Sequence, residues 1–249
     1  MKILILYPNL PMMMTPAPSV AIFTSIVKEM QCDVQLFETT LYAEHENQGM
    51  IYKSKLGGGR NYGLDQLGFS LKSTALMLPD FVQQVKEYKP DLLLCSTVED
   101  TFKDTNIMLK SVEKFNIPHI VGGVLPINAP EKCLSSPNIS VICRYEGELV
   151  LKEVIKKFKE GRDWKETPGL WYKKNGQIIK NPRQPLCNIN DVVPDFSLYD
   201  PVRFNRSMGG KVRSTLLFET YRGCPYSCTF CNSPMTRAMD KNYLRRKKI

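Results

Sequence analysis

The sequence predicts an α/β fold in which helices cover both faces of a parallel sheet. Within residues 1–162, short and continuously apolar runs alternate with segments whose apolar residues recur at helical spacing. The first run, residues 2–7, does not alternate apolar with polar residues, as expected for a parallel strand that is buried on both faces. Alternation of such strands with helices is typical of a doubly wound sheet.

Five strands are expected, at residues 2–7, 33–37, 91–96, 119–122 and 139–143. Helical spacing predicts intervening helices near residues 19–30, 81–88, 108–115 and 151–158. Residues 39–72, which include three consecutive glycines at 57–59, are predicted to be an insertion or a mobile loop. This pattern favours a flavodoxin-like domain over residues 1–162, with its ligand site beyond the carboxyl ends of the strands, near the switch in strand order.

Residues 163–249 have a different pattern. Asn175–Gly176 predicts a β-hairpin, because this pair supplies the positive φ angles of a type I′ turn. Prolines at positions 182, 185, 194 and 201 favour an extended connector, so residues 163–212 are expected to form a hairpin and connector. Residues 214–220 are predicted to form a strand that leads into a cysteine cluster, and residues 213–249 are expected to begin a second domain.

The composition is that of an ordinary globular protein, with 43% hydrophobic and 24% charged residues. The net charge of +9 is concentrated at the end of the chain, since the last nine residues hold five basic and no acidic side chains. The remaining 29 basic against 25 acidic residues leave +4, so nucleic-acid binding is not expected. The apolar runs are too short to span a membrane and no signal peptide is recognisable, which predicts a cytoplasmic protein.

Three of the eight cysteines lie close together, at Cys224, Cys228 and Cys231 with C-x3-C-x2-C spacing. Three thiolates on one loop can converge on one soft metal centre. A structural zinc site normally needs four protein ligands, and the two histidines, His45 and His119, are far away in sequence. Three ligands leave one iron of a cubane cluster open to a small molecule. A structural zinc site and chance cysteines are the alternatives, and the other five cysteines are expected to be buried apolar residues.

The cysteine motif resembles the C-x3-C-x-aromatic-C signature of radical S-adenosylmethionine (SAM) enzymes, with Phe230 at the aromatic position. The resemblance implies that Cys224, Cys228 and Cys231 hold a 4Fe–4S cluster and that its fourth iron binds SAM. Phe230 would then lie near the adenine of SAM. Reductive cleavage of SAM would give a 5′-deoxyadenosyl radical, which the protein would have to shield.

The preceding residues resemble the cobalamin-binding members of that family. The matching pieces are the Pro-rich connector with VPDF at 193–196 and three segments that follow predicted strands. The resemblance implies that cofactor contacts come from Ser96, Val98, Gly122, Gly123, Glu146, Gly147 and Glu148. It also implies that the loop at residues 8–19 faces the corrin ring of cobalamin.

Each of these smaller signals also has a structural interpretation. The glycine pair can be a plain turn, the glutamates can favour the start of a helix through its dipole, and the 8–19 loop can be a surface linker or an apolar lid. The D-x-H-x-x-G motif that supplies a histidine to cobalt is absent. We therefore expect either cobalt without a protein histidine or a domain that has the fold without the cofactor.

Together these features predict part of a cobalamin-dependent radical SAM enzyme, with methyl transfer or a ring rearrangement or cyclisation as its outcome. Only 18 residues follow Cys231, whereas the resembled family continues into a barrel. We therefore expect a part that is inactive alone, with no catalytic side chain of its own and with a second chain as a candidate source of the barrel. The small-molecule substrate is not identified by the sequence. The alternatives are a non-catalytic module that binds cobalamin or a nucleotide-tailed ligand, and a radical SAM protein whose N-terminal domain binds substrate or a partner.

Overall fold

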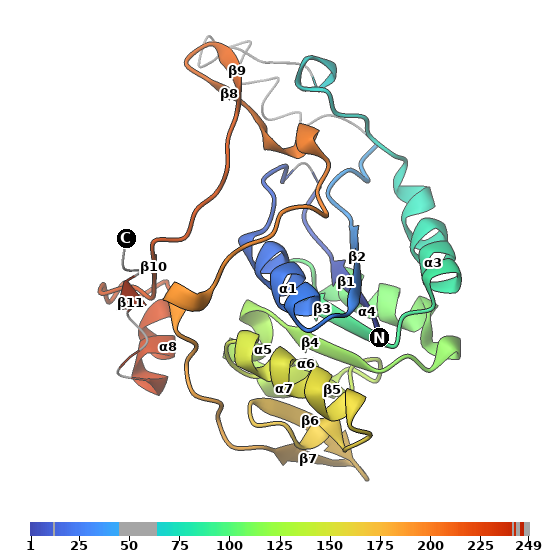
Figure 1. Cartoon of the computed structure of the whole chain (residues 1–249), viewed down its shortest axis with the longest axis vertical. Helices are drawn as coiled ribbons and strands as arrows, with labels where there is room; N and C mark the ends of the chain where they lie inside the picture. The colour runs from blue at the N-terminus through green and yellow to red at the C-terminus, as the bar shows by residue number, and fades with distance from the viewer. Residues whose placement is uncertain (12, 45–63, 241, 243–244, 247–249) are drawn as a thin grey trace.

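The fold is built on a seven-stranded, mainly parallel sheet with helices on both faces (Figure 1). The computed structural model describes residues 1–11, 13–44, 64–240, 242 and 245–246. The parallel strands are β1 (Lys2–Tyr7), β2 (Asp33–Glu38), β3 (Leu92–Ser96), β4 (His119–Gly122) and β5 (Val141–Cys143). Their order is β2-β1-β3-β4-β5, so the point at which the strand order reverses lies between β1 and β3. The prediction of the α/β class is confirmed.

The helices divide between the two faces of the sheet because successive residues of each strand point to opposite sides. Ile3 and Ile5 of β1 pack on one face against α1 (Pro18–Glu29) and α7 (Glu148–Lys159). Leu4 and Leu6 pack on the other face, in a core that includes residues of α3, α4 and α6. The helices of that side are α3 (Met77–Tyr88), α4 (Phe102–Ser111), α5 (Val124–Asn128) and α6 (Pro130–Ser135).

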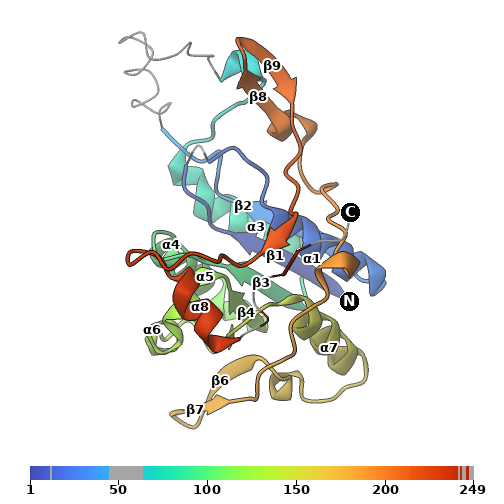
Figure 2. The ribbon, with the colours of Figure 1, turned by 90° about the vertical axis from the view of Figure 1, so that its left-hand side faces the viewer.

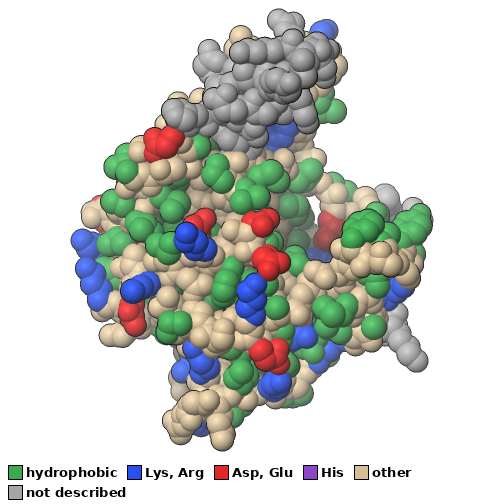
Figure 3. Space-filling model, turned by 180° about the vertical axis from the view of Figure 1, so that it is seen from behind, with side chains coloured by type: hydrophobic (Ala, Val, Ile, Leu, Met, Phe, Trp, Pro, Cys, Tyr) green, Lys and Arg blue, Asp and Glu red, His purple; other side chains and the backbone are tan. Residues whose placement is uncertain are grey.

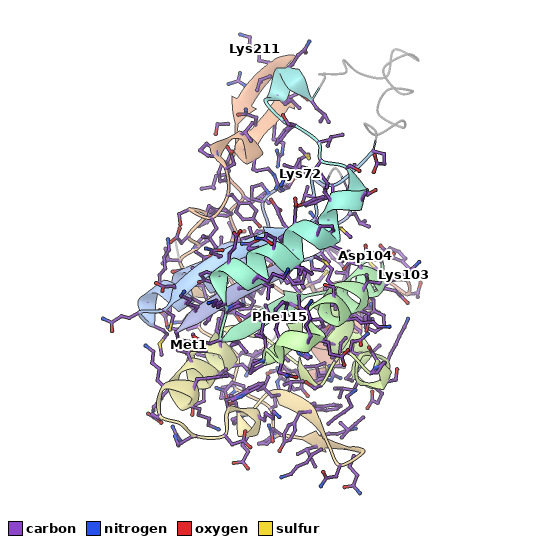
Figure 4. All side chains as sticks on the ribbon, turned by 90° about the vertical axis from the view of Figure 1, so that its right-hand side faces the viewer. Met1, Lys72, Lys103, Asp104, Phe115 and Lys211 are labelled. Atoms are coloured by element: carbon purple, nitrogen blue, oxygen red, sulfur yellow. The ribbon has the colours of Figure 1, made fainter. Side chains whose placement is uncertain are left out.

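The helix α3 covers one face of the sheet, and Asp80 of this helix binds side chains of the segment before it (Figure 4). Lys72 lies near the start of α3, where its ammonium group is 3.1 Å from a carboxylate oxygen of Asp80. The hydroxyl of Tyr42 donates to the same carboxylate at 2.7 Å. The glycines at 57–59, in the predicted insertion, lie outside the described residues.

The predicted hairpin forms, but it belongs to the main sheet. Its strands are β6 (Leu170–Lys174) and β7 (Gln177–Lys180), and β6 pairs antiparallel with β5. Asn175 and Gly176 have φ angles of 50° and 78°, as a type I′ turn requires. The sheet therefore has seven strands rather than the five predicted, because apolar side chains of β6 continue the buried faces of β5.

The segment before the cysteines differs from the prediction of a strand at 214–220. A turn at Gly209–Gly210 folds β9 (Lys211–Ser214) back onto β8 (Asn205–Met208) as a separate hairpin. Residues 215–220 have no regular secondary structure, and the strand that precedes them, β9, pairs with β8. The chain continues through β10 (Tyr221–Arg222) and α8 (Ser233–Met239), and β10 pairs with β11 (Arg245–Arg246).

The connector between the main sheet and the β8–β9 hairpin is anchored by buried polar contacts. The backbone N–H of Ala17 donates to the Tyr199 hydroxyl at 3.0 Å. Arg203, only 2% exposed, forms an ion pair with Glu38 at the end of β2 and donates to the Met14 carbonyl at 3.1 Å. These contacts hold the connector over the loop that follows β1.

The surface carries charges of both signs. Figure 3 shows basic and acidic side chains interspersed over the back of the molecule, without a large area of one sign. Among the described residues, no helix combines the length and apolar character that crossing a membrane requires.

Candidate functional site

A cavity of about 470 Å³ lies at the carboxyl ends of β3, β4 and β5. Its floor is apolar and includes Ile22 and Phe23 of α1 and Ile120 of β4, while residues of α8 and β10 line another side. Figures 1 and 2 show where α8 lies relative to the main sheet. Six of the predicted site residues line it, namely Ser96, Gly122, Gly123, Glu146, Gly147 and Glu148. Val98 is 40% exposed and does not line the cavity, nor do Phe230 and the three clustered cysteines.

The loops after β3 and β4 touch through their backbones at the mouth of the cavity. The N–H of Thr97 donates to the Gly122 carbonyl at 2.9 Å. A Cβ atom on Gly123 would lie 2.5 Å from the Thr97 carbonyl oxygen, and Gly123 has a φ of +101°. Only glycine fits this position, so Gly123 sets how closely the two loops approach. The buried Thr105 hydroxyl donates to that of Thr97 at 3.0 Å and fixes the loop that carries Ser96.

The turn between β5 and α7 is pressed against α1. A Cβ atom on Gly147 would lie 2.7 Å from the ring of Phe23, a distance that atoms in van der Waals contact do not reach. Gly147 is followed by Glu148, which is in the first turn of α7, where a carboxylate is favoured by the helix dipole. The close approach aims the two glutamates at the cavity rim instead of at solvent.

Both glutamates bind Arg222, which lies two residues before Cys224. Guanidinium nitrogens of Arg222 lie 3.3 Å from Glu146 and 2.6 Å from Glu148, and its Nε is 3.0 Å from Glu219. Burial opposes the charged form of Arg222, but the carboxylates of Glu148 and Glu219 outweigh it and raise its pKa above the usual value. The arginine therefore stays protonated at any physiological pH.

Cys187 of the connector completes this group. Its Sγ lies 3.3 Å from a guanidinium nitrogen of Arg222, and its N–H donates to Glu146 at 3.1 Å. Burial and the two nearby carboxylates raise the pKa of Cys187 to about 12, so this thiol stays protonated. Donor atoms of Glu146, Glu148 and Cys187 lie within 4.8 Å of one another, as in a metal site, but Arg222 is the cation that they share.

Arg222 and Cys187 are members of the site that the sequence pattern does not reveal. Cys187 is one of five scattered cysteines, and its burial matches the expectation for all of them. The position of Arg222 directly before the cysteine motif is the one signal that points to it. Glu146 and Glu148 are more than 70 residues away from Arg222 in sequence, so their contact is visible only in the fold.

The cysteine loop lies beside the cavity and is open to solvent. Cys224 is half-buried, Cys228 and Cys231 are exposed, and none of the three forms a disulfide. The Cys231 N–H donates to the Cys228 carbonyl at 3.2 Å, which closes a turn between them. The Ser233 N–H, 3.4 Å from the Cys231 sulfur, lowers the pKa of that thiol. Three free and accessible thiols on one turn fit the donor set of an iron–sulfur cluster.

Arg237 of α8 gives the loop its internal shape. Its guanidinium donates to the Cys224 carbonyl at 3.2 Å and to the Ser227 hydroxyl at 2.8 Å, and it also binds the Pro225 carbonyl. The loop is therefore folded back onto the helix that follows it. Phe230 is 91% exposed on this loop, directly before Cys231.

A further arginine, Arg183, attaches the end of α8 to the cavity wall. Arg183 of the connector donates to the Met239 carbonyl at 2.7 Å and pairs with Asp240 at 2.8 Å. Its guanidinium lies over the ring of Tyr145, 4.7 Å from the ring centre. Because Arg183, Tyr145 and Met239 all line the cavity, the end of α8 forms part of its wall.

Comparison with curated proteins shows several relatives. The chain is 29% identical over 163 residues to an uncharacterized methyltransferase of Pyrococcus horikoshii, covering 64% of this chain and 35% of that protein. It is 31% identical over 133 residues to 4′-phospho-dehydrooxetanocin synthase of Priestia megaterium, covering 52% and 17%. It is 27% identical over 152 residues to the cobalamin-dependent radical SAM methyltransferase TokK of Streptomyces tokunonensis, covering 58% and 22%. No family model matches the chain.

Solved structures show the same fold. The radical enzyme OxsB, with aqua-cobalamin and SAM bound, matches 92% of this chain with a TM-score of 0.60 at 22% identity. OxsB and TokK are both cobalamin-dependent radical SAM enzymes. The methyltransferase TsrM of Kitasatospora setae, with cobalamin and a [4Fe-4S] cluster bound, matches 94% of the chain with a TM-score of 0.58 at 16% identity.

The resemblance predicted from the cysteine motif is thus confirmed by both comparisons. The chain spans only 17 to 35% of the three curated relatives, 28% of OxsB and 41% of TsrM. At these identities, the solved structures establish the fold shared with cobalamin-dependent radical SAM enzymes.

Proposed function

We propose that this chain is the part of a cobalamin-dependent radical SAM methyltransferase that binds cobalamin and carries the iron–sulfur cluster. The observation that supports the proposal is the cavity at the carboxyl ends of the strands, lined by six predicted contact residues and joined through Arg222 to a loop with three free thiols. The methyltransferases of Pyrococcus horikoshii and Streptomyces tokunonensis support methyl transfer as the reaction.

The residues of the cavity suit a nucleotide-tailed ligand. The backbone of Gly122–Gly123 allows close approach, and the hydroxyl of Ser96 is available at the cavity mouth. The apolar floor under α1 and α7 would bury an aromatic base, and the loop after β1 would face the corrin ring. His119, the histidine within the described residues, lies at the start of β4 and does not line the cavity, so it would not ligate cobalt.

The cysteine loop supplies the other half of the site. Cys224, Cys228 and Cys231 would hold the cluster, with Phe230 available to contact the adenine of SAM. When bound, the cluster would supply the electron that cleaves SAM, and cobalamin would carry the methyl group. The chain's own contribution is to hold both groups near each other and to exclude water from the apolar cavity.

We further infer a flavodoxin-like core, supported by the order of the five parallel strands. The proposed domain boundaries are 1–162, 163–212 and 213–249, and the pairing of β6 with β5 supports extending the first unit to residue 180. Because the chain spans at most 35% of the curated relatives, we propose that it does not turn over alone and that further protein supplies the substrate pocket. No nucleic acid or membrane is needed for this role.

Anaerobic reconstitution with iron and sulfide tests the cluster. We expect charge-transfer absorbance from the full chain and its loss in Cys228→Ala, with Cys32→Ala as the matched control because Cys32 is buried in the core of the main sheet. Zinc binding without this absorbance would contradict the proposal and favour a structural metal site. Sustained release of 5′-deoxyadenosine from this chain alone would overturn the inference that it does not turn over.

Titration calorimetry with hydroxocobalamin tests the cavity. Alternate strand residues share a face, so the side chain at position 122 projects to the same face as Ile120, which lines the cavity. A Cβ at Gly122 meets its neighbours at 3.8 Å, an ordinary contact. We therefore expect Gly122→Val to fold but to bind at least about tenfold more weakly, which corresponds to roughly 1.4 kcal/mol. No binding to the unaltered chain would reject the cobalamin assignment and favour a domain that binds substrate or a partner.

A further inference from the structure

Two arginines attach this part of the chain to the cavity: Arg183 holds the end of α8, and Arg222, which is mostly buried, holds the start of the cysteine loop. The side chain of Arg222 is 13% exposed, and those of Glu146 and Glu148 are 16% and 9% exposed. Ion pairs at the surface contribute little, because water screens them and long side chains lose entropy. Breaking a buried pair costs far more, since the remaining charge is left without a partner. Because their side chains are at most 16% exposed, the contacts of Arg222 with Glu146 and Glu148 resemble buried ion pairs rather than surface ones.

Within the described part of the chain, the group around Arg222 contains more carboxylates than cations. Glu146, Glu148 and Glu219 face one guanidinium, and the neighbouring Cys187 thiol is neutral because burial and the carboxylates raise its pKa. Removing the guanidinium would therefore leave the buried carboxylate of Glu148 beside the partly buried carboxylate of Glu146 without this cation. This imbalance favours the arrangement in which β10 lies against the turn between β5 and α7.

Shape and position of the cysteine loop are controlled by different arginines. Arg237 of α8 binds Cys224, Pro225 and Ser227 of the loop, and it is not among the residues that line the cavity. Arg222 binds residues of the cavity rim. A change at Arg222 should therefore move the loop relative to the cavity while the loop keeps its internal hydrogen bonds.

We propose that Arg222 is a positioning residue that couples the cysteine loop to occupancy of the cavity. A ligand that packs against Glu146, Glu148 and Arg222 would stabilise the same arrangement that orders the loop. By thermodynamic reciprocity, order in the loop would then strengthen binding in the cavity. The coupling to cobalamin and the cluster rests on the proposed function, whereas the attachment itself does not.

Hydrogen exchange of the unloaded full chain tests the attachment. We expect backbone amides of residues 221–232 to exchange at least about tenfold faster in Arg222→Gln, with an intermediate effect in Arg222→Lys, which keeps the charge but not the forked geometry. Arg213→Gln is the matched control, because Arg213 is exposed on β9 and the charge change is the same. Unchanged exchange in Arg222→Gln would overturn the proposal.

A double-mutant cycle with Glu148 separates the contact from general destabilisation. Glu148→Gln also weakens the start of α7, but the cycle removes effects that each variant has alone. We expect Arg222→Gln to accelerate loop exchange much less in the Glu148→Gln background than in the original chain. Equal acceleration in both backgrounds would show that the two side chains do not act together.

Hydroxocobalamin titration before and after cluster reconstitution tests the coupling. We expect the reconstituted chain to bind several-fold more tightly, and this ratio to fall to one in Arg222→Gln. A ratio of one in the original chain would overturn the coupling. If no form binds hydroxocobalamin, the proposed function fails, while the exchange result still decides whether Arg222 holds the loop.

Discussion

At the scale of residues, close backbone contacts shape the cavity more than long side chains do. Gly123 touches Thr97 and Gly147 touches Phe23, and at both positions a Cβ atom would overlap a neighbour. These two contacts fix the turns that carry Ser96 and the glutamates. Both glycines were predicted as cofactor contacts, and the structure shows in addition that the backbone of Gly123 leaves no room for a side chain.

Replacement of Gly123 by alanine should be costly. A Cβ there would lie 2.5 and 2.8 Å from Thr97 backbone atoms, and the φ of +101° strains any other residue. We expect Gly123→Ala to lower the free energy of unfolding by about 2–4 kcal/mol, measured by urea denaturation. Gly161→Ala is the control, because Gly161 has a positive φ but nothing within 4 Å, and it should cost only about 1 kcal/mol. Equal losses would show that overlap with Thr97 is unimportant.

His119 should make the stability of the chain depend on pH. Burial lowers its pKa to about 4, with Lys173 and Lys165 acting in the same direction against a hydrogen bond to the backbone of Ile117. The imidazole of His119 has a pKa of 6.5 in the unfolded chain and about 4 in the folded chain. Between these values the unfolded chain binds more protons, so the free energy of unfolding decreases as the pH falls. We expect His119 to account for a loss of about 2 kcal/mol between pH 7 and pH 5.

The measurement for His119 is urea denaturation at both pH values. His119→Gln keeps an acceptor near the Ser140 N–H, which His119 Nε2 accepts at 3.1 Å, but it does not titrate. The variant should therefore lose about 2 kcal/mol less than the original chain over the same interval. An identical pH dependence in both proteins would contradict the buried neutral imidazole.

At the scale of elements, the connector determines how the second half of the chain meets the first. Its proline-rich residues bring Tyr199 and Arg203 back to the loop after β1, and Cys187 to the cavity rim. The connector is thus a packed strap across the carboxyl ends of the strands. Proline spacing alone predicts an extended path but not these contacts.

The ion pair of the connector should contribute strongly to stability. Arg203 and Glu38 are 2% and 18% exposed, so Arg203→Met would leave a nearly buried carboxylate without its cation. We expect a loss of about 3–5 kcal/mol in urea denaturation, most of it recovered when Glu38→Gln is added. Lys132→Met breaks the exposed pair with Glu99 and should cost less than about 1 kcal/mol. Similar losses for both pairs would refute the role assigned to burial.

At the scale of the whole molecule, the sequence predicts the α/β class and the cysteine motif more readily than the contacts between them. The parallel strands are recognisable because each is a continuous apolar run, and the hairpin because Asn175–Gly176 is specific. The pairing of β6 with β5 and the contacts of Arg222 with Glu146 and Glu148 join residues far apart in sequence. Local pattern carries no information about such pairings.

Ligand binding should stabilise the whole chain. A ligand that binds only the folded state adds about 2.7 kcal/mol at a free concentration of one hundred times its Kd. We expect hydroxocobalamin at this excess to raise the urea midpoint of the unaltered chain and to have a much smaller effect on Gly122→Val at the same concentration. Calorimetric binding without a shift of the midpoint would place the ligand outside the folded cavity.

The hairpin β6–β7 also has a consequence for association between copies of the chain. It covers the side of β5, so the sheet terminates there in β7, a strand of only four residues that ends in Lys180. Lysine on an edge strand disfavours the addition of a strand from another molecule, and a short edge strand offers few backbone hydrogen bonds to such a strand. By placing Lys173, Lys174 and Lys180 on this hairpin, the chain protects a strongly apolar sheet from growing into an intermolecular one.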